Sequence, residues 1–139
     1  MEHRFSPDTY YMSIGSHEPV LEVKSGDLVH TTTVDAGGRD MKGNQVAPRG
    51  NPQTGPFYVD NALPGDVLAV TLEKIWPNRN HGFCRPRISP NVLEPGHENS
   101  VPSPDIFNFV LDFATNTASI EYPSPALKNL FVPIRPMIG

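Results

Sequence analysis

The residues best suited to chemistry lie where a β-branched run gives way to a glycine-rich loop. Asp35 follows residues 31–34, and the loop after it carries Asn44 and Gln45. A carboxylate at a strand end can ligate a metal ion or activate a water, and the two amides can hydrogen-bond a bound molecule. The same carboxylate can instead cap the loop by accepting backbone N–H bonds. Both interpretations of Asp35 stay open from sequence alone.

Histidine spacing offers one further metal-ligand candidate. The five histidines are His3, His17, His30, His81 and His97, and no two of them stand two or four positions apart. His30 is the best candidate because it lies on the predicted strand that leads to Asp35. An offset of five residues puts the two side chains on opposite faces of a regular strand, so a shared metal requires a β-bulge between them.

Other reaction classes are poorly supported. Cys84 is the single cysteine, and His81 is close to it only in sequence, with no third residue placed to orient a base. His97 and Met137 follow Cys84 too distantly for a blue-copper site. Residues 35–45 lack phosphate-loop and dinucleotide-binding spacing, so their glycines are predicted to form turns.

Composition narrows the class of protein. The chain has 139 residues, 37% of them hydrophobic, and 16 prolines spread along its length, which disfavours long helices. A net charge of −4 without a Lys or Arg cluster argues against nucleic-acid binding. No apolar run approaches the roughly 20 residues that span a bilayer. Charged residues and a proline interrupt the amino terminus, so no signal-peptide core is recognised and a cytoplasmic protein is expected.

Apolar alternation predicts strands over residues 20–23, 28–35, 67–76, 106–113 and 118–122, the last two forming a hairpin through Asn116. A short apolar run at residues 57–59 predicts a further strand before the turn at 64–66. Gly-Asp precedes both 28–35 and 67–76. Residues 77–105 form a long proline-rich connection. We therefore expect a single, mainly β domain over residues 1–139, an antiparallel β-sandwich with long Pro-rich loops and few or no helices.

The most specific string lies between residues 51 and 70. Its distinctive positions are Asn51, Pro52, Thr54, Gly55, Pro56, Tyr58, Val59, Asp60, Ala62, Pro64, Gly65 and Asp66. In this pattern the chain resembles the acetamidase/formamidase family. Residues 18–29 and 31–36 are similar to the family's opening strands, and residues 131–139 to its passage ending in Ile-Gly. The resemblance covers roughly the amino-terminal half of a family member.

The resemblance implies hydrolysis of a short linear amide, such as formamide or acetamide, to ammonia and a carboxylic acid. Such a reaction needs an activated water and a stabilised oxyanion, which a divalent metal, here expected to be zinc, can provide. Asp35 is then the expected catalytic residue and, with His30, a metal ligand, while Asn44 and Gln45 bind the substrate. Because the resemblance covers half of the family, the expected partner is a second copy or a complementary second-half chain. The alternative is a non-catalytic β-sandwich module of the same ancestry.

Overall fold

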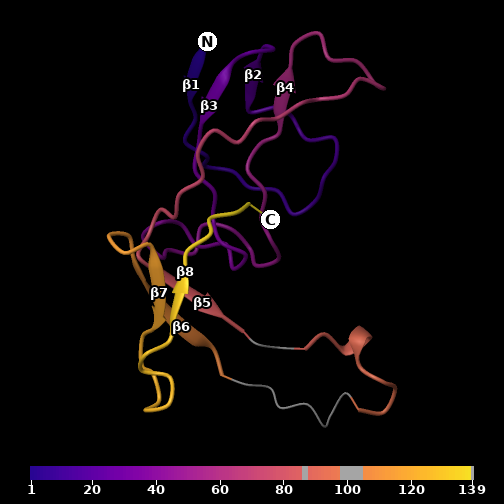
Figure 1. Ribbon diagram of the computed structural model, residues 1–139. Coiled ribbons are helices and arrows are strands. Elements are labelled where there is room, and N and C mark those ends of the chain that lie inside the picture. The colour runs from indigo at the N-terminus through magenta and orange to yellow at the C-terminus, as the bar shows by residue number, and fades with distance from the viewer. Residues whose placement is uncertain (86–87, 98–104, 139) are drawn as a thin grey trace. The chain divides into compact units, whose positions relative to one another are not determined.

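The computed structural model describes residues 1–85, 88–97 and 105–138, and the chain divides into two units, Met1–Glu73 and Lys74–Gly139 (Figure 1). Each unit has its own strand pairings, and we describe them separately. In the described residues, the only helical element is the short 3-10 turn η1 (Pro90–Val92). The regular structure is therefore mainly strand, as the sequence predicts. None of it is a helix with the length and apolar character to cross a bilayer.

The first unit contains two separate pairs of short parallel strands. β1 (Glu2–Arg4) pairs with β3 (Leu28–His30), and β2 (Leu21–Val23) pairs with β4 (Phe57–Val59) (Figure 1). Phe5, just beyond β1, meets the ring of Phe57 edge-on, with 5.5 Å between ring centroids. This contact between aromatic rings joins the two strand pairs through their side chains.

The turn before β3 explains why that strand begins where it does. Gly26 has a φ of 85°, which a residue with a Cβ rarely adopts, and the backbone N–H of Asp27 donates to the carbonyl of Lys24 at 3.0 Å. The Asp27 carboxylate accepts the backbone N–H of Lys24 at 2.9 Å, the Nε2 proton of His3 at 2.9 Å, and a bond from the amino group of Met1. The side chain of Asp27 therefore ties β1 to the head of β3.

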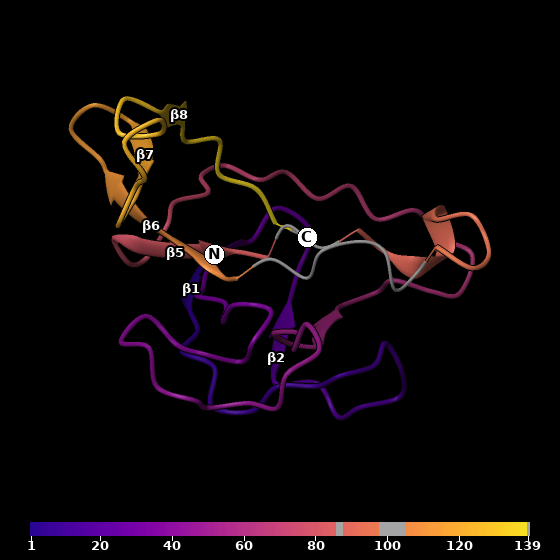
Figure 2. The ribbon, with the colours of Figure 1, turned by 90° about the horizontal axis from the view of Figure 1, so that it is seen from below.

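The second unit is a four-stranded antiparallel sheet in the order β5-β6-β7-β8. These strands are β5 (His81–Cys84), β6 (Phe107–Asp112), β7 (Thr117–Ile120) and β8 (Phe131–Pro133), and Figure 2 shows them from a second direction. The predicted hairpin is confirmed: β6 and β7 pair from Phe109↔Ile120 to Asp112↔Thr117. Asn116 has a φ of 55° in the connecting turn, a conformation that asparagine tolerates well.

Several predictions of strand position and direction differ from the structure. Strands β1, β5 and β8 were not expected, and the strand predicted at 28–35 is paired only over Leu28–His30. The first unit pairs its strands in parallel, not antiparallel as expected, because alternation within a strand carries no information about its partner's direction. The strand expected at 67–76 is not formed, and the small sheets do not close into a sandwich.

Little apolar surface is buried within the described residues. Ala47, at 7% exposure, and Pro52 are the buried apolar side chains. The chain exposes 11006 Å², whereas a compact monomer of this mass exposes about 7,100 Å² and two separate compact halves together about 8,600 Å². Local turns and strand ladders thus supply more of the conformational order than a hydrophobic core does.

The charge of Asp27 should stabilise the first unit in a pH-dependent way. The N-terminal amine, His3 and the Lys24 backbone N–H hold the pKa of Asp27 well below its ordinary value. A lowered folded-state pKa stabilises the fold above the unfolded value of about 4, and this stabilisation disappears as the pH falls toward the folded value. We expect Asp27→Asn to be less stable than the native chain at pH 7, with the difference shrinking below about pH 4. Urea unfolding of both proteins, measured across this pH range, tests the prediction. A stability difference between them that does not change with pH would contradict it.

Candidate functional site

Asp35 lies five residues beyond the end of β3, at the start of a loop that it organises itself. Its Oδ1 accepts the backbone N–H of Gly37 at 2.8 Å and of Arg39 at 3.0 Å. The backbone carbonyl of Asp35 accepts the N–H of Gly38 at 2.8 Å, and its N–H donates to the carbonyl of Arg39 at 3.0 Å. The capping role that the sequence allowed for Asp35 is therefore present in the structure.

Asp40 repeats this arrangement five residues later. Its Oδ1 accepts the backbone N–H of Lys42 at 2.9 Å and of Asn44 at 2.8 Å, and its carbonyl accepts the N–H of Gly43 at 3.0 Å. Desolvation acts to raise the pKa of Asp40, but the backbone N–H groups of Asn44 and Lys42 outweigh it and hold the pKa below its ordinary value. Residues 35–47, which we call the Asp35 loop, thus contain two aspartate-capped turns in tandem.

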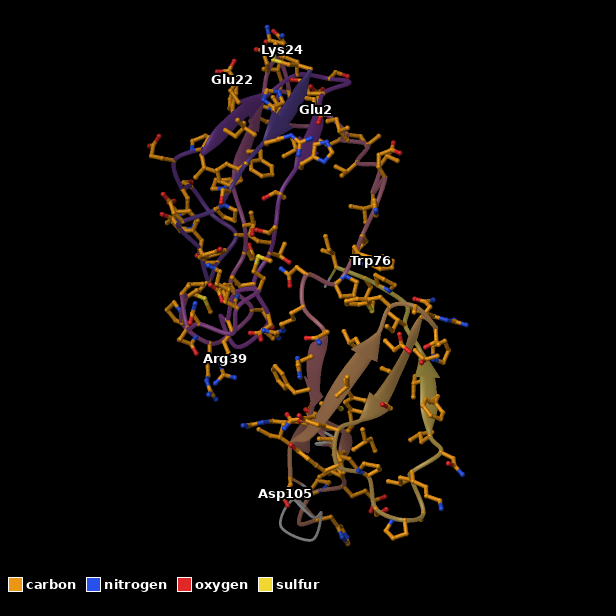
Figure 3. All side chains as sticks on the ribbon, turned by 90° about the vertical axis from the view of Figure 1, so that its left-hand side faces the viewer. Glu2, Glu22, Lys24, Arg39, Trp76 and Asp105 are labelled. Atoms are coloured by element: carbon orange, nitrogen blue, oxygen red, sulfur yellow. The ribbon has the colours of Figure 1, made fainter. Side chains whose placement is uncertain are left out.

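The end of the Asp35 loop folds back onto its beginning. The backbones of Gln45 and Arg39 form an isolated antiparallel β-bridge. The side-chain Nε2 of Gln45 donates to the backbone carbonyls of Gly37 and Ala47. The carbonyl of Gly38 accepts the N–H groups of residues 46 and 47 at 3.0 and 3.1 Å. The side chain of Arg39 projects outward from the loop (Figure 3). The loop is consequently a closed hydrogen-bonded unit, in which the side chain of Gln45 links the backbone near the start of the loop to the backbone at its end.

The distinctive string at residues 51–66 begins beside this loop. The backbone N–H groups of Gly50 and Asn51 donate to the carbonyl of Ala36 at 3.1 and 3.2 Å, and the hydroxyl of Thr54 donates to the carbonyl of Thr32 at 3.3 Å. The residues before and after Asp35 are therefore both held by residues 50–54.

The structure brings together only some of the predicted site residues. Asp35, Asn44 and Gln45 share one loop, and the side-chain amide of Asn44 lies 3.4 Å from Asp40 Oδ2. His30 is engaged elsewhere, since its Nε2 is 3.0 Å from Oε1 of Glu2 on the neighbouring strand β1. The predicted catalytic, substrate-binding and metal-binding roles of these residues stay predictions.

The expected zinc site is not assembled within the described residues. A zinc site needs three or more nitrogen, sulfur or carboxylate ligands that converge on one point. Within the described part of the chain, no group of three His, Cys, Asp or Glu side chains could hold a metal ion. Asp35 and His30, the two predicted ligands, are engaged in separate interactions.

A serine and a histidine also meet in the first unit. Ser13 Oγ lies 3.3 Å from Nε2 of His17, whose ring stacks on Tyr11 with centroids 3.9 Å apart. The same Nε2 lies 3.1 Å from the backbone carbonyl of Ser13, to which it can only donate. A ring nitrogen that donates to a carbonyl cannot simultaneously accept the serine proton, so this pair lacks the geometry of a nucleophile and its base.

Sequence reasoning missed Asp40 and the tight packing at Gly38. Both follow from a pattern in the sequence, because Asp-x-x-Gly occurs twice in succession, ending at Gly38 and Gly43. These two glycines have φ values of 79° and 83°, in the left-handed region that glycine adopts without strain. The repeated spacing was the available signal for the tandem turns.

Comparison with known proteins finds no match to a family model, a curated protein or a solved structure.

The two glycines of the tandem turns provide a matched test of the loop. A Cβ at Gly38 would lie 2.1 Å from the carbonyl oxygen of Ala47, whereas a Cβ at Gly43 meets nothing within 4 Å. We expect Gly43→Ala to cost about 1 kcal/mol through its φ alone. Gly38→Ala should cost more than about 4 kcal/mol or open the loop altogether. Urea unfolding of both variants measures this; equal costs would show that Gly38 and Ala47 are not closely packed.

Proposed function

We propose that this chain hydrolyses the C–N bond of short linear amides such as formamide or acetamide, within a β-sandwich that a further polypeptide surface completes. The observation that supports the proposal is the attachment of the Asp35 loop to the segment at residues 50–54. That segment carries the resemblance to the acetamidase/formamidase family, and Asp35 is the carboxylate beside it.

In this proposal Asp35 positions and activates the attacking water. Amide hydrolysis requires proton removal from water, stabilisation of the oxyanion and protonation of the departing amine. The bonds from Gly37 and Arg39 fix the orientation of the Asp35 carboxylate through its Oδ1. Such orientation before substrate binds lowers the entropic cost of reaching the reactive geometry.

Asn44 and Gln45 supply the substrate contacts in this proposal. The Nε2 of Gln45 donates to two backbone carbonyls of the loop. The side-chain carbonyl of Gln45 is therefore the group that an amide N–H of the substrate can approach. The side chain of Asn44 offers the same kind of acceptor from the preceding residue. Both residues are exposed, so a small substrate reaches them from solvent.

A non-catalytic β-module is the second candidate. The observation that favours it is the similarity between Asp35 and Asp40, which make the same two backbone contacts from their Oδ1 atoms. A carboxylate whose function is to hold a turn needs no further role. The exposed apolar surface described above fits a module that binds another polypeptide.

Matched aspartate variants distinguish these two functions. We expect the native chain to release ammonia from formamide or acetamide, and Asp35→Asn to reduce the rate by about 100-fold or more through loss of the base. Asp40→Asn should leave the rate within about threefold, since asparagine retains an Oδ1 acceptor for the backbone bonds. Ammonia should be measured with and without added zinc and over a range of protein concentrations.

Unfolding measurements on the same variants provide the control for structure. Asp35→Asn and Asp40→Asn should both keep the loop, whereas Asp35→Ala should destabilise it by about 1 kcal/mol through loss of two backbone hydrogen bonds. No ammonia release from a folded native chain under any of these conditions would overturn the hydrolase proposal. Equal rates for Asp35→Asn and the native chain would remove Asp35 from the catalytic role.

A further inference from the structure

Residues 67–73 form an apolar segment that makes no hydrogen bond with another described residue. The side chains of Val67, Leu68, Val70 and Leu72 are 93%, 58%, 80% and 59% exposed. The alternation and β-branched content of this segment are those of a strand, yet it belongs to no sheet in the described part of the chain. Its backbone N–H and C=O groups are therefore open to a partner strand.

The turn that begins this segment matches the turn that begins β3. Gly65 has a φ of 101°, the N–H of Asp66 donates to the carbonyl of Leu63 at 3.0 Å, and Asp66 Oδ2 accepts the N–H of Leu63 at 2.8 Å. Asp27 makes the equivalent contacts with Lys24. After the first of these turns the chain enters a paired strand, whereas after the second it enters an apolar segment without a partner.

We propose that residues 66–74 pair antiparallel with the same residues of a second copy of this chain, about a two-fold axis through Val70. This register places Leu68 opposite Leu72 and Asp66 opposite Lys74, and symmetry repeats each pair. Two oppositely charged pairs then bracket a stripe of six apolar side chains on one face. Opposite charges and apolar side chains facing one another are the cross-strand pairs that stabilise a sheet.

Neighbouring registers lack this complementarity. Centring the axis on Glu73 sets Glu73 against itself, and centring it on Leu72 sets Lys74 against Val70. Centring it on Thr71 or Ala69 sets a charged residue against leucine. A parallel, in-register pair would stack glutamate on glutamate and lysine on lysine, which is unfavourable. Charge complementarity therefore selects both the antiparallel direction and the axis at Val70.

Lys74 and Trp76 lie on the same side of the chain. The Nζ atom of Lys74 lies over the indole of Trp76, 5.8 Å from its centroid, so these side chains project to the same side. Residues two apart on a strand share a face, which places Lys74 with the even-numbered apolar residues. The pairing is independent of the amide chemistry proposed above.

Sedimentation equilibrium on the full chain tests for the dimer, which we expect to dissociate at concentrations of about 1 to 100 μM. Lys74→Glu sets two acidic side chains together at both ends of the stripe and should weaken the dimer by about tenfold or more. Glu73→Lys is the matched control, because Glu73 lies opposite Val67 and should change the dimer by less than about threefold.

Cysteine cross-linking tests the register. With the exposed Cys84 replaced by serine, Val70→Cys should form a disulfide-linked dimer under mild oxidation, since the two Cα atoms at the axis lie within disulfide range. Val67→Cys is the control, because the two copies of residue 67 lie about 20 Å apart in this register. A monomer at all concentrations overturns the proposal. So does a dimer that cross-links no faster through residue 70 than through residue 67, or one that Lys74→Glu and Glu73→Lys affect equally.

Discussion

Aspartate carboxylates that accept backbone N–H bonds within turns hold much of this structure in place. Asp27 and Asp66 bind the first N–H of the turns before β3 and before residues 67–73, and Asp35 and Asp40 organise the tandem turns of the Asp35 loop. Asp112 similarly accepts the N–H of Ala114 at 2.9 Å in the β6–β7 hairpin. Each contact satisfies a donor that the bent backbone cannot pair with a strand. Short-range bonds of this kind fix local conformation even where little apolar surface is buried.

A structure held mainly by local hydrogen bonds, with little buried apolar surface, has a low free energy of unfolding. Hydrophobic burial is the dominant favourable contribution to folding, and a net hydrogen bond adds only about 1 kcal/mol. With Ala47 and Pro52 as the buried apolar side chains of the described residues, well-formed turns are combined with apolar side chains that face solvent. Association that covers those side chains would add the burial that the isolated chain lacks. Such association would couple folding to assembly, as happens in obligate oligomers.

The sequence predicted local structure well and long-range pairing poorly. Alternation of phenylalanine and leucine with smaller or polar residues in 107–113 located β6, and Asn116 located its hairpin, because both signals lie within a few residues. The parallel partner of β3 was not predictable, since β1 is far away in sequence and only three residues long. β5 was missed within the proline-rich connection. The same limitation explains residues 67–76, whose pattern predicts a strand but cannot supply the partner strand that it needs.

The local sequence around Asp35 likewise predicted its turn but not its function. The chemistry of aspartate allowed both a capping and a catalytic role for Asp35, and the structure shows the capping role. Asp35 and Asp40 differ in what surrounds their turns. Ala36 accepts bonds from Gly50 and Asn51, so the turn of Asp35 is anchored to another segment, whereas Asp40 caps the turn nearer the tip of the loop. Catalysis requires a carboxylate held by a rigid scaffold, and by that criterion Asp35 is the better placed of the two.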